Sequence, residues 1–85
     1  MARYKLLFKK SVAKDLRALP GRDVRSILRR INALADEPRA AGCKKLSGRE
    51  YYRVRQGVYR ILYEIIDDQL LVHVIKVGHR SRVYQ

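Results

Sequence analysis

Three arginines in the second half of the chain have the spacing of a phosphate-binding face. Arg53 and Arg55 are separated by one apolar residue, and Arg60 follows a short turn. Side chains two residues apart on a strand share a face, and Arg60 joins the pair if the apolar residues of both strands face the core. Three like charges on adjacent strands repel one another unless an anion neutralises them. The alternative interpretation is a solvated sheet face, the commonest meaning of such alternation.

A second basic group follows the last apolar run. Arg80 and Arg82 come directly after it, and Tyr84 lies two residues further on. Guanidinium groups contact phosphate through paired hydrogen bonds, and an exposed tyrosine ring can stack on an unpaired base. The combination favours single-stranded RNA, with Lys44 and Lys45 adding charge upstream. The alternative for Tyr84 is a hydrophobic plug or a frayed terminus.

His79 lies within the basic region, and histidine can gain and lose a proton near neutral pH. It is therefore a candidate for proton transfer, with an exposed, solvated side chain as the alternative. His73 lies in an apolar run and is expected to be a sheet residue. Cys43 is the one cysteine, so neither an internal disulfide nor a zinc site is expected, and no metal or other cofactor is implied.

The charge balance of the whole chain is one-sided. Its 85 residues include 20 Lys and Arg against 8 Asp and Glu, a formal net charge of +12, so the expected partner is an anion. The length suits a single domain over residues 1–85. No apolar run approaches the roughly 18 residues of a membrane span, and the first residues do not resemble a secretion signal. A cytoplasmic protein without membrane contact is expected.

The first half of the chain predicts one strand and two helices. A short strand is expected over 3–8. Apolar residues then recur at helical spacing over 12–19 and 24–35, with Ser11 and Asp23 as candidate N-caps and a break at Pro20-Gly21. Residues 36–48 are expected to form a connecting loop.

The second half changes to strand periodicity. Alternating apolar residues predict two strands over 52–65, joined at Gln56-Gly57, and the run 70–77 predicts a mostly buried strand after a turn at Asp67-Asp68. The predicted class is α+β, in the order β-α-α-β-β-β, with a helical hairpin packed on one face of a mostly antiparallel sheet.

Four segments, in this order, resemble the RelE/ParE toxin superfamily, and its RelE branch most closely. They are Lys45-Leu46-Ser47-Gly48, Tyr52-Arg53-Val54-Arg55, Tyr59-Arg60-Ile61-Leu62-Tyr63 and Val77-Gly78-His79-Arg80. The resemblance implies the toxin of a type II toxin–antitoxin system, which cuts messenger RNA in the ribosomal decoding site. It also implies an acidic RelB-like antitoxin as partner, through which the complex binds operator DNA.

The resemblance also implies roles for individual residues. Arg60 matches the arginine that holds the scissile phosphate, Arg80 the arginine after the last strand, and Tyr84 the tyrosine that stacks on an RNA base. Arg53 and Arg55 stand where the best-known members have lysine, and a guanidinium, which keeps its proton, is a poor general base. His79 then becomes the candidate acid or base. The catalytic set is Arg55, Arg60, His79, Arg80 and Tyr84, and the RNA-binding set is Lys44, Lys45, Arg53 and Arg82.

The implied reaction is metal-free attack of an RNA 2′-OH on the adjacent phosphate. Two other functions fit the same sequence. One is a ParE-like inhibitor of DNA gyrase, which needs no catalytic residues, and the other is a non-catalytic nucleic-acid-binding module, for which the net charge alone would suffice.

Overall fold

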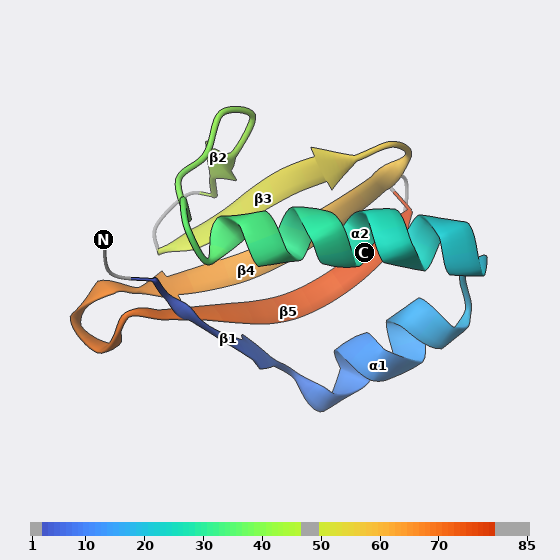
Figure 1. The fold of residues 1–85 in the computed structure, drawn as a ribbon, viewed down its shortest axis with the longest axis horizontal. Coiled ribbons are helices and arrows are strands. Elements are labelled where there is room, and N and C mark those ends of the chain that lie inside the picture. Colours follow the sequence, from blue (N-terminus) through green and yellow to red (C-terminus); the bar gives the residue numbers. More distant parts are fainter. Residues whose placement is uncertain (1–2, 47–49, 80–85) are drawn as a thin grey trace.

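The computed structural model describes residues 3–46 and 50–79 as two α-helices and a five-stranded sheet (Figure 1). The elements are β1 (Lys5–Phe8), α1 (Lys10–Arg17), α2 (Gly21–Leu34), β2 (Lys44–Lys45), β3 (Tyr51–Gln56), β4 (Tyr59–Ile66), a 3-10 turn η1 (Asp67–Gln69) and β5 (Leu71–His79). The strand order is β1-β5-β4-β3-β2, with β1 parallel to β5 and every other pair antiparallel. The predicted α+β class is confirmed, and β2 is a short addition within the expected loop.

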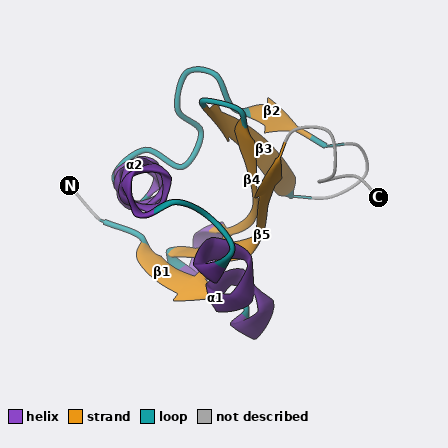
Figure 2. Cartoon of the chain, turned by 90° about the vertical axis from the view of Figure 1, so that its right-hand side faces the viewer, coloured by secondary structure: helices purple, strands orange, loops and turns teal. Residues whose placement is uncertain are grey.

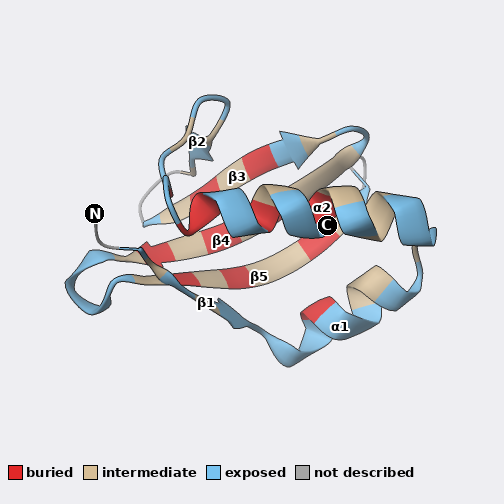
Figure 3. Cartoon of the chain, viewed as in Figure 1, coloured by how far each residue is buried: buried red, intermediate tan, exposed pale blue. Residues whose placement is uncertain are grey.

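Both helices cover the same face of the sheet (Figure 2). The chain runs out along α1 and back along α2 (Figure 1), as the predicted helical hairpin requires. Along β3 and β4, buried and more exposed residues alternate (Figure 3), so one face of the sheet packs under the helices. The fully buried side chains of this core are Val12, Ile27, Ile31, Leu34, Val54, Ile61, Tyr63, Val72 and Val74. Neither helix in the described ranges is long and apolar enough to cross a membrane.

The predicted helix caps are wrong. α1 begins at Lys10, so Ser11 lies inside the helix, and α2 begins at Gly21 after an extended Pro20. Proline fixes φ and is extended here with ψ 144°, which allows the helix to start directly after it. The Asp23 carboxylate accepts a hydrogen bond from the Tyr59 hydroxyl at 2.7 Å. Asp23 therefore ties the first turn of α2 to the start of β4.

A register shift interrupts the pairing of β4 with β5. Leu62 lies opposite Lys76, but the next residue, Tyr63, lies opposite Val74. The extra residue in β5 reverses which positions of that strand face the helices, so Val72, Val74 and then Val77 are buried. From Lys76 onward, β5 therefore presents the opposite set of side chains to each face.

Arg39 holds together the end of the sheet that carries η1. Its Nη2 lies 2.8 Å from Asp67 Oδ2 and 3.2 Å from Glu50 Oε2, and its guanidinium lies 5.4 Å from the centre of the Tyr52 ring. The Tyr4 hydroxyl donates to Asp67 Oδ1 at 2.7 Å. Hydrogen bonds from Arg39 and then Tyr4 lower the pKa of Asp67 to about 2. Asp67, predicted only to form a turn, is an anchor between distant segments.

Candidate nucleic-acid interface

The arginines of β3 and β4 lie on the sheet face that is turned away from the helices. On β3, the buried Tyr52 and Val54 point toward the helices, so Arg53 and Arg55 point to the opposite face. On β4, Arg60 alternates in the same way with buried residues. The expectation that the three arginines share a face agrees with this register.

The strand pairing brings these charges close together. Arg55 lies directly opposite Arg60, and Arg53 lies opposite Leu62, the neighbour of Arg60 on the same face. Directly opposed Cβ atoms in an antiparallel pair lie about 5 Å apart, and diagonal neighbours about 7 Å. Lys44 of β2 extends the row, since it lies opposite Arg53. Like charges at this spacing repel one another, and a bound anion would remove that cost.

β5 adds a cation and an open position to this face. Lys76 lies opposite Leu62, and Gly78 lies opposite Arg60. Glycine has no side chain, so nothing from that position of β5 covers Arg60. The sequence did not predict Lys76 and Gly78 on this face, because the register shift in β5 cannot be read from an uninterrupted apolar run. We call Lys44, Arg53, Arg55, Arg60 and Lys76 the arginine face.

The acidic side chain that shares this face on β4 is Glu64, and it interacts away from the arginines. Its Oε1 lies 3.5 Å from His73 Nδ1, and the two residues are opposite each other in the β4–β5 register. In the strand register, the cations of the arginine face lie toward the end of β4 that carries Arg60, away from Glu64.

An apolar hollow adjoins these cations. It has a volume of about 210 Å³ and is lined by Leu46, Tyr51, Leu62, Tyr63 and Ile75. Leu62 lies opposite Arg53, so this apolar floor and the charged groups are neighbours on one surface. A flat unpaired base beside a charged phosphate presents the same combination of surfaces.

Two of the predicted site residues do not join the arginine face. Lys45 lies opposite Tyr52, on the helix-facing side, and its Nζ lies 3.1 Å from Glu50 Oε1. His79 lies opposite Tyr59, also on the helix-facing side. Its ring meets the Tyr59 ring edge-on, with centroids 6.4 Å apart. The alternation of β5 therefore turns the His79 side chain to the face opposite the arginines.

His79 instead lines a cleft of about 560 Å³ between α1 and β5. Asp15 of α1 lies in the same cleft, and its Oδ2 accepts a hydrogen bond from the backbone N–H of Val77 at 3.2 Å. The other predicted site residues, Arg80, Arg82 and Tyr84, lie outside the described residues.

Comparison with known proteins identifies the family. The model of the ParE toxin of type II toxin–antitoxin systems, parDE, matches residues 6–84. The chain belongs to the RelE/ParE toxin superfamily. It is 34% identical to the toxin RelE3 of Methanocaldococcus jannaschii over 94% of both chains.

Solved structures place the chain among the RelE-like members of the superfamily. The RelE–RelB complex from Pyrococcus horikoshii OT3 matches with a TM-score of 0.84 and 29% identity, over 98% of this chain and 100% of that one. The toxin–antitoxin complex RelBE2 from Mycobacterium tuberculosis matches with a TM-score of 0.83 and 30% identity, over 95% of each chain. The resemblance drawn from the sequence is confirmed, and this chain is a RelE-like toxin of the type II class.

Proposed function

We propose that this RelE-like toxin is an endoribonuclease that cleaves messenger RNA in the decoding site of the ribosome. The observation that carries the proposal is the register that sets Arg55 opposite Arg60, with Arg53 and Lys44 on the same face. A phosphodiester flanked by unpaired bases matches these cations and the apolar hollow beside them. Arg80, Arg82 and Tyr84 complete the proposed site from the segment that follows β5.

The proposed chemistry uses a nucleophile that belongs to the RNA. The 2′ oxygen attacks the adjacent phosphorus, the bond from phosphorus to the 5′ oxygen breaks, and the products carry a 2′,3′-cyclic phosphate and a 5′-OH. The 2′ hydroxyl loses a proton and the leaving 5′ oxygen gains one. Arg60, with Arg55 opposite, would stabilise the charge that develops on the phosphate oxygens, and one such preorganised donor is worth roughly a hundredfold or more in rate.

The arginines are not proposed to carry the protons. A guanidinium stays charged throughout the accessible pH range, so it binds and stabilises but does not act as a general base. His79 is not proposed to act directly either, since its strand position faces the helices. We infer that alignment of the RNA and charge stabilisation supply the protein's main contribution.

The test is primer-extension mapping of transcripts after incubation with purified ribosomes and the toxin. We expect cleavage within codons at the decoding site, products with 5′-OH ends, and no cleavage of the same RNA without ribosomes. The matched variant is Arg60→Ala, which removes the central guanidinium while leaving the buried side of β4 unchanged. Wild-type cleavage by Arg60→Ala would refute the assignment.

We further propose that a RelB-like antitoxin holds the toxin inactive. The net charge of +12 suits an acidic partner, and the similar structures from Pyrococcus horikoshii and Mycobacterium tuberculosis are toxin–antitoxin complexes. The experiment is co-expression with a candidate acidic protein encoded beside the toxin, followed by purification of the complex. Growth arrest by the toxin alone and its reversal by the partner are the expected results.

A second candidate function follows from the family model, which describes a ParE toxin. A ParE-like function would be inhibition of DNA gyrase, and such an inhibitor would not need the arginine face. Induction in cells separates the two functions. Cut transcripts with continued DNA synthesis support the nuclease, whereas damaged DNA with intact transcripts supports the gyrase inhibitor. Binding of RNA without either effect would indicate a non-catalytic nucleic-acid-binding module.

A further inference from the structure

The proposed reaction needs a proton donor on the arginine face. When the bond from phosphorus to the 5′ oxygen breaks, that oxygen must gain a proton, because a free alkoxide is a poor leaving group. The guanidinium groups of Arg53, Arg55 and Arg60 keep their protons at any ordinary pH. The donor must therefore be another kind of side chain on the same face.

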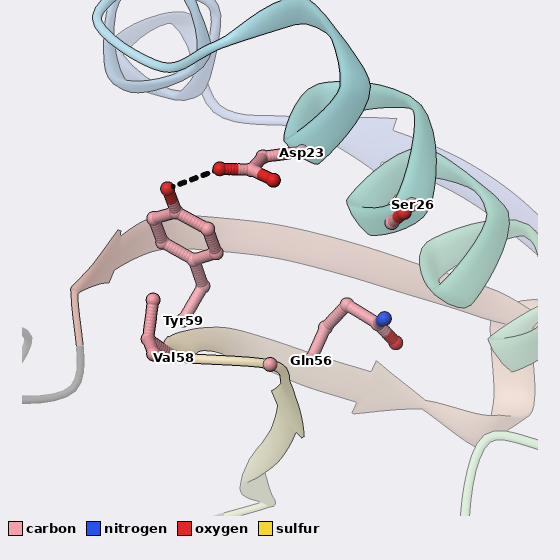
Figure 4. A pocket seen from close by; sticks show the side chains of 6 residues that line it. Asp23, Ser26, Gln56, Val58 and Tyr59 are labelled. Carbon is pink, nitrogen blue, oxygen red and sulfur yellow. Dashed lines mark hydrogen bonds between the residues drawn. The ribbon is translucent and has the colours of Figure 1, made fainter.

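The tyrosine and histidine at this end of the sheet are turned toward the helices. The Tyr59 hydroxyl donates to Asp23 of α2 at 2.7 Å, beside a hollow of about 260 Å³ between α2 and the β3–β4 turn (Figure 4). This hydrogen bond, with desolvation, raises the pKa of Tyr59 above its ordinary value. The His79 ring meets the Tyr59 ring edge-on. Both groups therefore lie across the sheet from Arg60.

Lys76 has both the position and the chemistry of a donor. It lies opposite Leu62, and the next residue, Val77, is buried, so Lys76 points to the face turned away from the helices. A lysine ammonium carries a proton at neutral pH and can transfer it, which a guanidinium cannot do. The Lys76 side chain is also partly exposed, so RNA can reach it.

The strand order separates the two lysines of the arginine face. Lys44 of β2 lies two strands from Arg60, whereas Lys76 lies on β5, the strand next to Arg60. Gly78 is directly opposite Arg60, so Lys76 is the diagonal neighbour of Arg60, at about 7 Å. Because Gly78 has no side chain, that position adds nothing between Lys76 and a phosphate held by Arg60.

The Lys76 ammonium is not committed to a carboxylate. Among residues 3–46 and 50–79, no ion pair joins Lys76 to an acidic side chain. Glu64, on the same face, lies 3.5 Å from His73. Asp15 borders the cleft between α1 and β5 together with Lys76, but its carboxylate accepts the backbone N–H of Val77 at 3.2 Å. The ammonium can therefore turn to an RNA oxygen.

We propose that Lys76 is the general acid that protonates the leaving 5′ oxygen. This inference rests on the proposed nuclease function and adds a catalytic residue to it. A phosphate over β4, in contact with Arg60, has the arginines of β3 on one side and Lys76 on the other. In-line attack places the entering and leaving oxygens on opposite sides of phosphorus, and Lys76 serves the leaving side.

The proton transfers balance as follows. The 2′ oxygen forms its bond to phosphorus while the 2′ hydroxyl releases its proton to water. The bond from phosphorus to the 5′ oxygen breaks with its electron pair on that oxygen, which takes a proton from Lys76 Nζ. The neutral amine recovers a proton from the solvent before the next turnover.

The first experiment compares oxygen and sulfur as leaving atoms. Ribosomes carry a messenger RNA whose scissile linkage is either ordinary or has sulfur in place of the bridging 5′ oxygen, and single-turnover rates are measured. A thiolate leaves without being protonated, because thiols are far more acidic than alcohols. We expect Lys76→Gln to cleave the ordinary linkage about a hundredfold or more slowly than wild type, and the sulfur linkage within about threefold of wild type. Equal slowing with both linkages, or no slowing with the ordinary one, overturns the proposal.

Lys76→Arg separates proton donation from charge. It keeps the positive charge but holds its proton, so we expect the same loss with oxygen and the same recovery with sulfur. Near-wild-type cleavage of the ordinary linkage by Lys76→Arg overturns the proposal, because charge alone would then suffice.

Two matched variants complete the comparison. Arg60→Ala should be slow with both linkages, because charge on the phosphate oxygens develops with either leaving atom. Lys14→Gln removes an equal charge from an exposed position on α1, across the sheet, and should cleave both linkages within about twofold of wild type. Sulfur recovery in Arg60→Ala, or a loss in Lys14→Gln equal to that in Lys76→Gln, overturns the proposal. Thermal melting of each variant checks its fold.

These outcomes separate the inference from the function on which it rests. If the wild-type toxin cleaves neither linkage on ribosomes, the proposed nuclease function fails. If the wild type cleaves and both Lys76 variants cleave the ordinary linkage equally well, the nuclease function stands and the role of Lys76 is refuted.

Discussion

Arg39 and Arg60 are the same side chain in opposite surroundings. Arg39 lies within hydrogen-bond reach of two carboxylates and a tyrosine hydroxyl. Its hydrogen bonds to Asp67 and then Tyr52 raise its already high pKa. Arg60 lies opposite another arginine and a glycine. Cations surrounded by carboxylates brace the fold, whereas cations gathered beside one another on an open face suit an incoming anion. The different neighbours of the two arginines are the reason that we propose a structural role for Arg39 and a phosphate-binding role for Arg60.

The largest effects should come from removing the side chain of Arg60 or that of Arg39. We expect Arg60→Ala to reduce ribosome-dependent cleavage by about a hundredfold or more at unchanged melting temperature. Arg39→Ala should lower the melting temperature and leave cleavage per folded molecule near wild type, because its partners join segments of the fold. The two readouts are a cleavage time course and thermal circular dichroism. Equal loss of cleavage activity in Arg60→Ala and Arg39→Ala would contradict the different roles assigned to the two arginines.

RNA binding should reveal the arginine face through its salt dependence. If the five described cations of this face each neutralise a phosphate of single-stranded RNA, the log–log slope of affinity against salt is roughly −3.5. Arg55→Ala should bring the slope to roughly −2.8, whereas Arg39→Ala should leave it unchanged. Fluorescence anisotropy with a short RNA across a salt series gives both values. An equal change of the salt slope in Arg55→Ala and Arg39→Ala would contradict the proposal that only the arginine face binds phosphate.

A substitution on the buried side of the sheet should change stability and leave activity unchanged. Tyr63 is fully buried, and its hydroxyl donates to the carbonyl of Pro38 at 2.7 Å. Tyr63→Phe leaves that carbonyl without its donor and should lower the free energy of unfolding by about 1 kcal/mol. Urea denaturation measures this change, and cleavage per folded molecule serves as the control. An activity change larger than the loss of folded protein would contradict a purely structural role.

Acid should weaken the Arg39 cluster before it affects the arginine face. The folded-state pKa of Asp67, about 2, lies below its ordinary value of 3.8, so the unfolded chain binds the proton first. The contribution of Asp67 is therefore complete above about pH 4 and is lost as the pH falls toward 2. Asp67→Asn should flatten the dependence of unfolding free energy on pH in this window. Urea titrations at several pH values test this. An unchanged dependence of unfolding free energy on pH in Asp67→Asn would contradict the role of Asp67 as an anchor.

The smallest effect is expected at His79. It lies across the sheet from the arginine face, so His79→Ala should leave the cleavage rate within about threefold of wild type and the pH–rate profile unchanged. Loss of a general acid or base typically costs a factor of 10² to 10⁴. A drop of that size, with a lost limb in the pH profile, would return His79 to the catalytic set.

Most of the fold could be predicted from local pattern. The alternation in β3 and β4 gives their buried face directly, and the helical spacing of Ile27 and Ile31 gives the face that α2 buries. The shared face of Arg53, Arg55 and Arg60 follows from the same alternation, because the turn at Gly57 keeps the two strands in simple register. These features depend on neighbours close in sequence.

Features set by distant contacts could not be predicted. The extra residue of β5 reverses its faces, which removes His79 from the arginine face and adds Lys76 to it. Asp23 looked like a helix cap because its partner Tyr59 lies 36 residues away in the chain. The ion pair of Lys45 with Glu50 could not be predicted, because no local pattern reveals that Glu50 folds back beside it.

The parallel pairing of β1 with β5 has a consequence for biosynthesis. The first strand pairs with the last described strand, so this edge of the sheet cannot form before β5 has been synthesised. Contacts between distant parts of a chain form late, after the intervening segments have been made. A nascent toxin therefore completes its sheet only when β5 has left the ribosomal exit tunnel.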